Sequence, residues 1–246
     1  MTKPGRHIVV VEDAAALADT AAERVIERIE AQSGPIAICM TGGSSPKRLY
    51  ELLATEPYRS QIPWDRVHWF IGDDRFVPAD DANNNMTMAR TAFLDACAPA
   101  ANVHAIKTDA ANPEEAAALY ARELQSFYGS EHLHPSKLLF DLVLLGVGPD
   151  GHVASLFPGY PAVEVTDRWV VGVPEAHVKP FVPRVSLTLP TLASCREMLF
   201  LMSGDDKRAI LGRVLAGEDL PANRARALGE TVWLCDKAAL PENFRG

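Results

Sequence analysis

Short apolar runs alternate along the chain with longer segments in which apolar positions recur every three or four residues. The short runs predict strands, and the longer segments predict helices that bury one face. The run Phe140–Leu145 is apolar at almost every position, which is typical of a strand covered on both faces. The predicted strands span residues 7–11, 35–40, 67–71, 102–106, 140–145, 168–173, 184–189, 197–202 and 231–236.

The predicted helices begin with recognisable capping residues. Side chains of Asp, Ser and Asn accept hydrogen bonds from the free N–H groups of a helix start, and proline is favoured in the first turn. Asp13, Ser45 and Asn112 are the expected N-caps of three helices, and proline follows the last two. The expected helices cover residues 14–31, 46–54, 86–96 and 205–217, another opens at 113, and residues 83–85 are expected to form a cap or turn.

The order of these elements predicts the fold class. Strands and helices alternate through most of the chain, which is the pattern of a parallel sheet with helices on both faces. No repeat, low-complexity tract or linker interrupts the pattern. We therefore expect one Rossmann-like α/β domain over residues 1–246, with a mainly parallel sheet.

Composition narrows the possible partners. The chain has 246 residues, and 24 Lys and Arg against 32 Asp and Glu give a net charge of −8. An acidic chain without a basic run is a poor candidate for binding nucleic acid or an anionic membrane. No apolar stretch has the length of a membrane span, and the N-terminus lacks the apolar core of a signal peptide. We expect a cytoplasmic protein in which any anionic ligand meets local positive charge.

Cysteine and histidine spacing argues against several kinds of site. The four cysteines, Cys39, Cys97, Cys195 and Cys235, form no C-x-x-C pair, and all but Cys97 lie in or beside apolar runs. Buried, reduced thiols are expected from this pattern. The histidines are not at zinc-ligand spacing, and H-E-x-x-H and the serine-hydrolase motif G-x-S-x-G are absent. We expect no metal and no serine nucleophile, so any hydrolysis would use water directly.

The sequence GVGPDG at residues 146–151 matches the dinucleotide fingerprint G-x-G-x-x-G. Its variable positions include Pro149 and Asp150, and the Asp150 carboxylate would place negative charge where a diphosphate must lie. The first strand–helix unit, which is the usual place of the motif, does not contain it. We therefore predict that the match is fortuitous and that the chain needs no nicotinamide cofactor.

Positive charge and free N–H groups gather at the carboxyl ends of the predicted strands, where open α/β sheets bind ligands. The loop TGGSS at residues 41–45 combines flexible glycines with a helix start, and its N–H groups can bind a phosphate. Arg184 and Lys207 lie near the ends of later strands. Together these three features predict a site for an anionic ligand.

Groups suited to proton transfer lie at the same edge. His152 follows the strand 140–145 in a glycine-rich loop and is two residues from Asp150. Histidine is the side chain best suited to proton transfer near neutral pH. Asp73 and Arg75 directly follow the strand 67–71. We expect this group of residues to include a general base and a residue that orients it.

Four segments, in this order, resemble the 6-phosphogluconolactonase family. They are TGGSSPKRLYELL, HWFIGDDRFVPADDANNNMTMAR, FDLVLLGVGPDGHVASLFPG and RVSLTLPTL. The resemblance extends from the first predicted strand to the last. It implies the Rossmann-like fold shared with glucosamine-6-phosphate deaminases. It also implies hydrolysis of 6-phospho-D-glucono-1,5-lactone to 6-phospho-D-gluconate in the oxidative pentose phosphate pathway, without a cofactor.

The resemblance leads to a mechanistic hypothesis. His152 would act as general base on the water that attacks the lactone carbonyl, while Arg75 and N–H groups of residues 146–151 would stabilise the oxyanion. Either Asp73 or Asp150 would orient the imidazole. The expected catalytic residues are His152, Asp73 and Arg75. The expected substrate-binding residues are Gly42, Gly43, Ser44, Ser45, Asp150, Arg184 and Lys207.

Two other functions fit parts of the sequence. Amino-sugar-phosphate deaminases or isomerases of this superfamily have a glutamate directly before a proline where this chain has Phe157, which cannot transfer a proton. A sugar-phosphate sensor of a transcription regulator would carry a DNA-binding domain ahead of the sensor, and the first predicted strand begins at residue 7. We expect a monomer or weak oligomer whose small-molecule partner is a sugar phosphate lactone.

Overall fold

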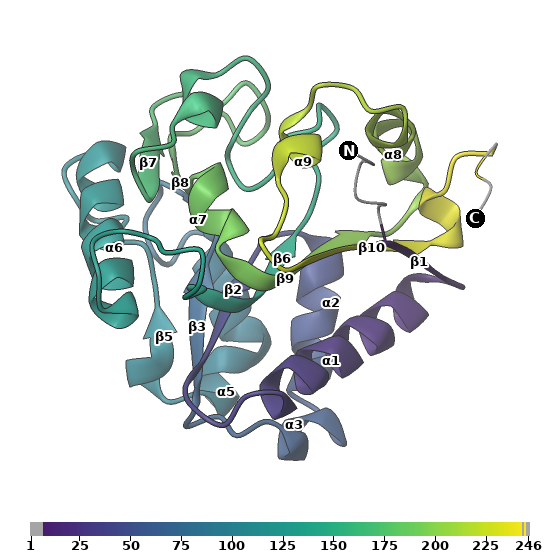
Figure 1. Cartoon of the computed structure of the whole chain (residues 1–246), viewed down its shortest axis with the longest axis horizontal. Helices are drawn as coiled ribbons and strands as arrows, with labels where there is room; N and C mark the ends of the chain where they lie inside the picture. The colour runs from purple at the N-terminus through teal and green to yellow at the C-terminus, as the bar shows by residue number, and fades with distance from the viewer. Residues whose placement is uncertain (1–6, 243, 245–246) are drawn as a thin grey trace.

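The computed structural model describes residues 7–242 and 244. The N-terminal segment in which we expect no signal peptide lies partly outside these residues. Figure 1 shows a central sheet with α1 and α2 on one face and α7, α8 and α9 on the other. In the described part of the chain, no helix is both long and apolar enough to cross a membrane.

Seven parallel strands form the central sheet, in the order β1-β10-β9-β6-β2-β3-β5. This confirms the predicted Rossmann-like architecture. The strands are β1 (His7–Val11), β2 (Ile36–Met40), β3 (Val67–Ile71), β5 (Val103–His104), β6 (Phe140–Leu145), β9 (Cys195–Met202) and β10 (Glu230–Asp236).

The order of the strands reverses between β2 and β6. From β2 the chain runs outward through β3 to β5, and from β6 it runs outward in the other direction through β9 to β10. The two strands at the reversal pair directly, with Ile38 opposite Leu142 and Cys39 opposite Val143. Loops that leave such a switch point diverge and open a crevice at the carboxyl edge.

A second, antiparallel sheet of three strands was not predicted. It contains β4 (Asp73–Arg75), β8 (Arg184–Leu187) and β7 (Val170–Val173), in that order. The sequence pattern did not predict β4, because three polar residues have no strand periodicity. β4 is a strand only because it pairs with β8 from a distant part of the chain.

The helices follow the predicted order. The α-helices are α1 (Ala14–Glu30), α2 (Ser44–Leu53), α3 (Tyr58–Gln61), α4 (Asn85–Ala89), α5 (Asp95–Cys97), α6 (Pro113–Tyr128), α7 (Leu189–Ala193), α8 (Arg208–Leu215) and α9 (Pro221–Arg224). A π-helical turn, η1 (Arg90–Leu94), joins α4 to α5, and short 3-10 turns are η2 (Ala100–Asn102), η3 (Pro161–Glu164), η4 (Asp205–Lys207) and η5 (Lys237–Ala239). The short helices α3, α7 and α9 were not predicted, and α7 ends the predicted strand 184–189 early.

The expected caps are confirmed at two of three helices. Asp13 accepts from the N–H groups of Ala15 and Ala16, and Asn112 accepts from Glu115. The expectation of Ser45 as an N-cap is wrong, because α2 begins at Ser44 and Gly43 is the cap residue. Gly43 has a φ of 116°, a conformation that side chains disfavour, so the chain turns into α2 earlier than predicted.

The predicted burial of thiols is confirmed for Cys39, Cys195 and Cys235. Burial raises the pKa of the Cys39 thiol well above its usual value and raises that of Cys235 to about 12. A thiol that stays protonated is a poor nucleophile. These cysteines therefore act as small apolar residues of the core.

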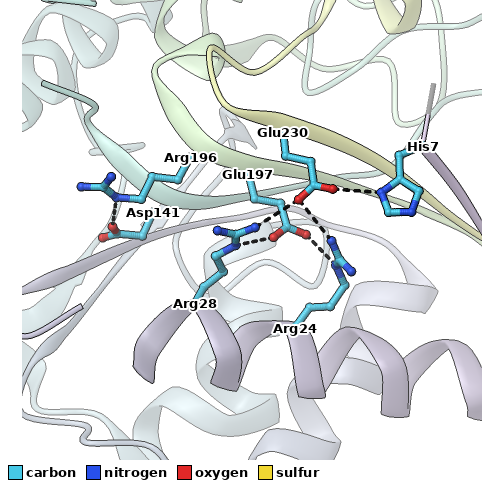
Figure 2. Close-up of polar contacts among 7 residues, drawn as sticks. All are labelled: His7, Arg24, Arg28, Asp141, Arg196, Glu197 and Glu230. Carbon is cyan, nitrogen blue, oxygen red and sulfur yellow. Dashed lines mark hydrogen bonds and ion pairs between the residues drawn. The ribbon is translucent and has the colours of Figure 1, made fainter. Parts of the chain in front are cut away.

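A network of ion pairs joins α1 to the amino ends of β9 and β10 (Figure 2). At its centre is Glu197, which is 1% exposed and accepts from Arg24 Nε at 2.6 Å and from Arg28 Nε. Arg28 also donates to Glu230, which contacts His7 Nδ1 at 2.9 Å. Both arginines are needed here, because a buried carboxylate is stable only when paired.

We predict that Glu197→Ala destabilises the fold by about 3 kcal/mol, because two arginines lose a buried partner. The partial exposure of Arg24 and Arg28 keeps the cost at the lower end of the usual range. Urea unfolding followed by circular dichroism measures the change. Glu218→Ala, which breaks an exposed pair with Arg213, is the control and is expected to cost less than about 0.5 kcal/mol. Equal losses in the two variants would contradict this account.

Candidate active site

A cleft of about 270 Å³ opens at the carboxyl edge of the central sheet, formed by loops after β9, β6, β2 and β3. This volume is below the roughly 300–1,000 Å³ of pockets for drug-sized ligands, so the cleft fits one small molecule. Most of the predicted site residues line it: Gly42, Gly43, Ser44, Ser45, Asp73, Arg75, His152, Arg184 and Lys207. Asp150 does not line the cleft but contacts His152.

The loop after β2 presents a helix start to the cleft. The Tyr50 hydroxyl fixes its beginning, because it accepts from Thr41 N–H at 3.0 Å and donates to Thr41 C=O at 2.9 Å. Gly43 then turns the chain into α2, whose first residues, Ser44 and Ser45, line the cleft. N–H groups of a first helical turn have no acceptor within the helix, and together with the helix dipole they attract an anion.

Asn85 contacts both this loop and β4. The sequence predicted only that residues 83–85 form a cap or turn. Its backbone N–H donates to Asp74, and its side-chain Nδ2 donates to Asp73 C=O at 3.0 Å. A Cβ atom on Gly42 would come within 2.1 Å of Asn85 Oδ1. Gly42 is therefore required by the close approach of the Asn85 amide, and no sequence motif indicated this contact.

Asp74 holds the start of α4 against β4. Its fully buried carboxylate accepts from the N–H groups of Asn85 at 2.6 Å, Met86 at 3.0 Å and Arg75 at 2.8 Å. Burial raises the pKa of Asp74 to about 7, against the opposing effect of the N–H groups of Asn85 and Met86. Asp74 thus fixes the backbone from which Asp73 and Arg75 reach the cleft.

Two arginines, Arg75 and Arg184, line the cleft together with Asp73. Arg75 of β4 is directly opposite Arg184 of β8 in the antiparallel register. Arg75 Nη1 donates to Asn83 C=O at 2.7 Å, and its buried Nε has no hydrogen-bond partner among the described residues. Arg184 donates to carbonyls of its own loop, and burial lowers its pKa. Like charges opposite each other are unfavourable, so this pair favours a bound anion.

His152 faces the cleft in a defined tautomer. Its Nδ1 lies 2.5 Å from Asp150 Oδ1. Partial burial raises the pKa of Asp150, but the hydrogen bonds and charge of His152 outweigh it, so the pKa lies well below its usual range. An ionised carboxylate only accepts, which places a hydrogen on Nδ1 and leaves the Nε2 lone pair free.

The two acids that the sequence left as alternatives have different hydrogen-bond partners. Asp150 contacts the His152 imidazole directly. Asp73 instead accepts a hydrogen bond from Ser155 Oγ at 2.6 Å, and Ser155 was not among the predicted residues. Asp73 lines the cleft from β4, and His152 lines it from the loop after β6.

Two of the glycines of GVGPDG, Gly148 and Gly151, shape the turn that carries His152. A Cβ atom on Gly148 would lie 2.0 Å from His152 Cε1, so any side chain there displaces the imidazole. Gly151 has a φ of 94°, which glycine adopts at no steric cost. Both glycines are thus explained by the turn that carries His152.

Phe157 packs beneath the loop that carries His152. It is fully buried, and its ring centroid lies 4.8 Å from that of His152 and 5.0 Å from that of His177. His177 also contacts Asp150, at 2.8 Å, and sequence reasoning missed it, because a single histidine in a loop between strands gives no motif. An apolar ring at position 157 supplies support and no acid or base.

The family model described as glucosamine-6-phosphate isomerases/6-phosphogluconolactonase matches residues 12–233. The chain belongs to this family. A curated 6-phosphogluconolactonase of Synechocystis sp. is 41% identical over 227 residues, which cover 89% of each chain. That of Streptomyces coelicolor is 40% identical and covers 95% of this chain and 93% of its own.

Solved structures of the glucosamine-6-phosphate isomerase/6-phosphogluconolactonase family share the fold. The 6-phosphogluconolactonase from Trypanosoma cruzi superposes with a TM-score of 0.85 at 30% identity, covering 96% of both chains. That from Thermotoga maritima has a TM-score of 0.81 at 32% identity, covering 95% of this chain and all of its own. A monomeric glucosamine-6-phosphate deaminase, at 17% identity and a TM-score of 0.80, shows that the fold extends to deaminases, as expected.

We predict that Gly148→Ala disables the site while the protein stays folded, because the new methyl group overlaps the His152 ring. Catalytic turnover is expected to fall at least about tenfold, the effect of roughly 1.4 kcal/mol of lost transition-state stabilisation. Gly34→Ala, where a Cβ atom meets nothing within 4 Å, is the matched control and is expected to keep full activity. Hydrolysis rates and circular dichroism spectra of both variants test this, and normal turnover in Gly148→Ala would contradict it.

Proposed function

We propose that the chain hydrolyses 6-phospho-D-glucono-1,5-lactone to 6-phospho-D-gluconate, a step of the oxidative pentose phosphate pathway, with His152 as general base. The observation that carries the proposal is that one cleft contains both groups that can bind an anion and a histidine that can act as a base. Arg75 and Arg184, which can bind an anion, line the same cleft as His152, whose Nδ1 contact with Asp150 leaves Nε2 available as a base. The curated relatives over most of the chain are lactonases, which agrees with this reading.

The phosphate binds to the loop after β2. Gly42, Gly43, Ser44 and Ser45 supply N–H and hydroxyl groups, and Arg184 and Lys207 supply charge. Lys207 is fixed for this task, because its Nζ donates to Val147 C=O at 3.2 Å. Anchoring the phosphate places the lactone ring at the histidine, and such positioning supplies a large part of the barrier reduction.

The chemical step begins with a water molecule between His152 and the lactone carbonyl. His152 Nε2 takes one proton from the water as its oxygen bonds to C1, and the carbonyl oxygen becomes an oxyanion. Arg75 and N–H groups of residues 146–151 stabilise that charge. The C1–ring oxygen bond then breaks, the ring oxygen takes the proton from His152, and the open-chain acid results.

Asp150 supports both stages of this cycle. Its hydrogen bond keeps His152 Nδ1 protonated in the resting state, and its charge stabilises the imidazolium after the water has lost its proton. Asp73, held by Ser155, lies across the cleft and orients the water or a sugar hydroxyl. The free thiols suit the cytoplasm.

We predict that His152→Ala lowers kcat by at least about a hundredfold, because the general base is lost. Binding of 6-phosphogluconate is expected to persist, since the phosphate loop is untouched. The lactone is generated from glucose 6-phosphate, its disappearance is followed with wild type and variant, and spontaneous hydrolysis is subtracted. Near-normal kcat in the variant would remove His152 from this role, and no acceleration by wild type would overturn the proposed function.

We predict that substitutions of Arg184 and Arg75 affect different kinetic constants. Arg184→Ala is expected to raise KM about tenfold or more, because a charged phosphate contact is lost. Arg75→Ala is expected to act mainly on kcat, because its charge is needed when the oxyanion forms. Steady-state kinetics of both variants, with Arg213→Ala on the surface as the control, test the assignment. The reverse pattern would exchange the two roles.

A further inference from the structure

We propose that His177 positions the catalytic histidine by holding the far oxygen of Asp150. His177 lies in the loop between β7 and β8, whereas Asp150 and His152 lie in the loop after β6. Its Nε2 is 2.8 Å from Asp150 Oδ2. This inference rests on the proposed function, because it assigns His177 a part in the same reaction.

Each oxygen of the Asp150 carboxylate is bound to a different imidazole. Oδ1 lies 2.5 Å from His152 Nδ1 and also accepts from the His152 backbone N–H at 3.2 Å. Oδ2 lies 2.8 Å from His177 Nε2. Rotation of the carboxylate would break both contacts, so the second histidine fixes the rotamer that aims Oδ1 at His152.

The charge on Asp150 determines which ring nitrogens of His152 and His177 carry a hydrogen. Because an ionised carboxylate has no hydrogen to donate, His177 must carry a hydrogen on Nε2 and His152 one on Nδ1. The His177–Asp150 contact then supports the Asp150–His152 contact and leaves the Nε2 lone pair of His152 free. His177 acts on the base through Asp150 and never touches the reacting atoms.

Packing around His177 supports this polar role. Its ring meets Phe157 at 5.0 Å and Tyr160 at 5.3 Å between centroids, so its approach to Asp150 is fixed by two aromatic neighbours. Its side chain is nonetheless 42% exposed, and it is not among the residues that line the cleft. Neither full burial nor substrate binding accounts for a histidine here, whereas the contact with Asp150 does.

Two variants separate the hydrogen bond from the packing of the ring. His177→Phe keeps an aromatic ring and removes the N–H group, while His177→Gln removes the ring and keeps an amide N–H near the place of Nε2. We expect His177→Phe to lower kcat about tenfold with KM changed less than about twofold, because the loss acts on the chemical step. We expect His177→Gln to recover most of the activity. His132→Phe is the control, because His132 is exposed and distant from His177 in sequence.

A second readout needs no substrate. In protein labelled with ¹⁵N-histidine, the Nδ1 proton of His152 is expected far downfield in the ¹H spectrum, because it lies in a short bond to a carboxylate. We expect this resonance in wild type and His177→Gln and its loss or broadening in His177→Phe.

The outcomes are distinct. Unchanged kcat and an unchanged resonance in His177→Phe would overturn the inference. Equal loss of kcat in the Phe and Gln variants would also overturn it, because the N–H group would then not be the active feature. If wild type fails to hydrolyse the lactone while the resonance still depends on His177, the proposed function falls and the positioning contact stands.

Discussion

The site depends on the pairing of β2 with β6, where the order of strands in the sheet reverses. Because both strands are parallel and central, the loops that follow them start from neighbouring points and run apart. One loop carries Gly42 and Gly43 and the other carries His152. The adjacent strands β3 and β9 add Asp73 and Lys207 at the same edge. A different order of strands would leave these residues scattered along the edge.

Much of this arrangement follows from the sequence alone. The apolar runs predict where strands end, and in a parallel sheet their carboxyl ends share an edge, so glycines, charges and histidine after those ends were expected to meet. Tertiary contacts account for what was missed. β4 is a strand only beside β8, and Asn85, Ser155 and His177 act through partners that are 12 to 82 residues away in sequence. No local pattern contains such pairings.

The cleft also explains how an acidic chain binds an anion. The net charge is −8, yet Arg75 and Arg184 lie opposite each other, and within residues 7–242 and 244 neither donates a side-chain hydrogen bond to a carboxylate. Loop carbonyls hold both side chains in place. Asp73 and Asp74 offset part of the repulsion between the two cations, and a bound dianion would relieve the rest.

Stability and chemistry are placed at opposite edges of the sheet. At the amino edge, Glu197 and Glu230 are satisfied by Arg24 and Arg28, which ties α1 to β9 and β10 (Figure 2). At the carboxyl edge, Arg75 Nε is buried and unpaired. A carboxylate bound directly to this Nε would remove that cost, but it would also neutralise the charge that we propose for the oxyanion. The unpaired cation is therefore tolerated where it binds ligand, because paired charges elsewhere hold the sheet together.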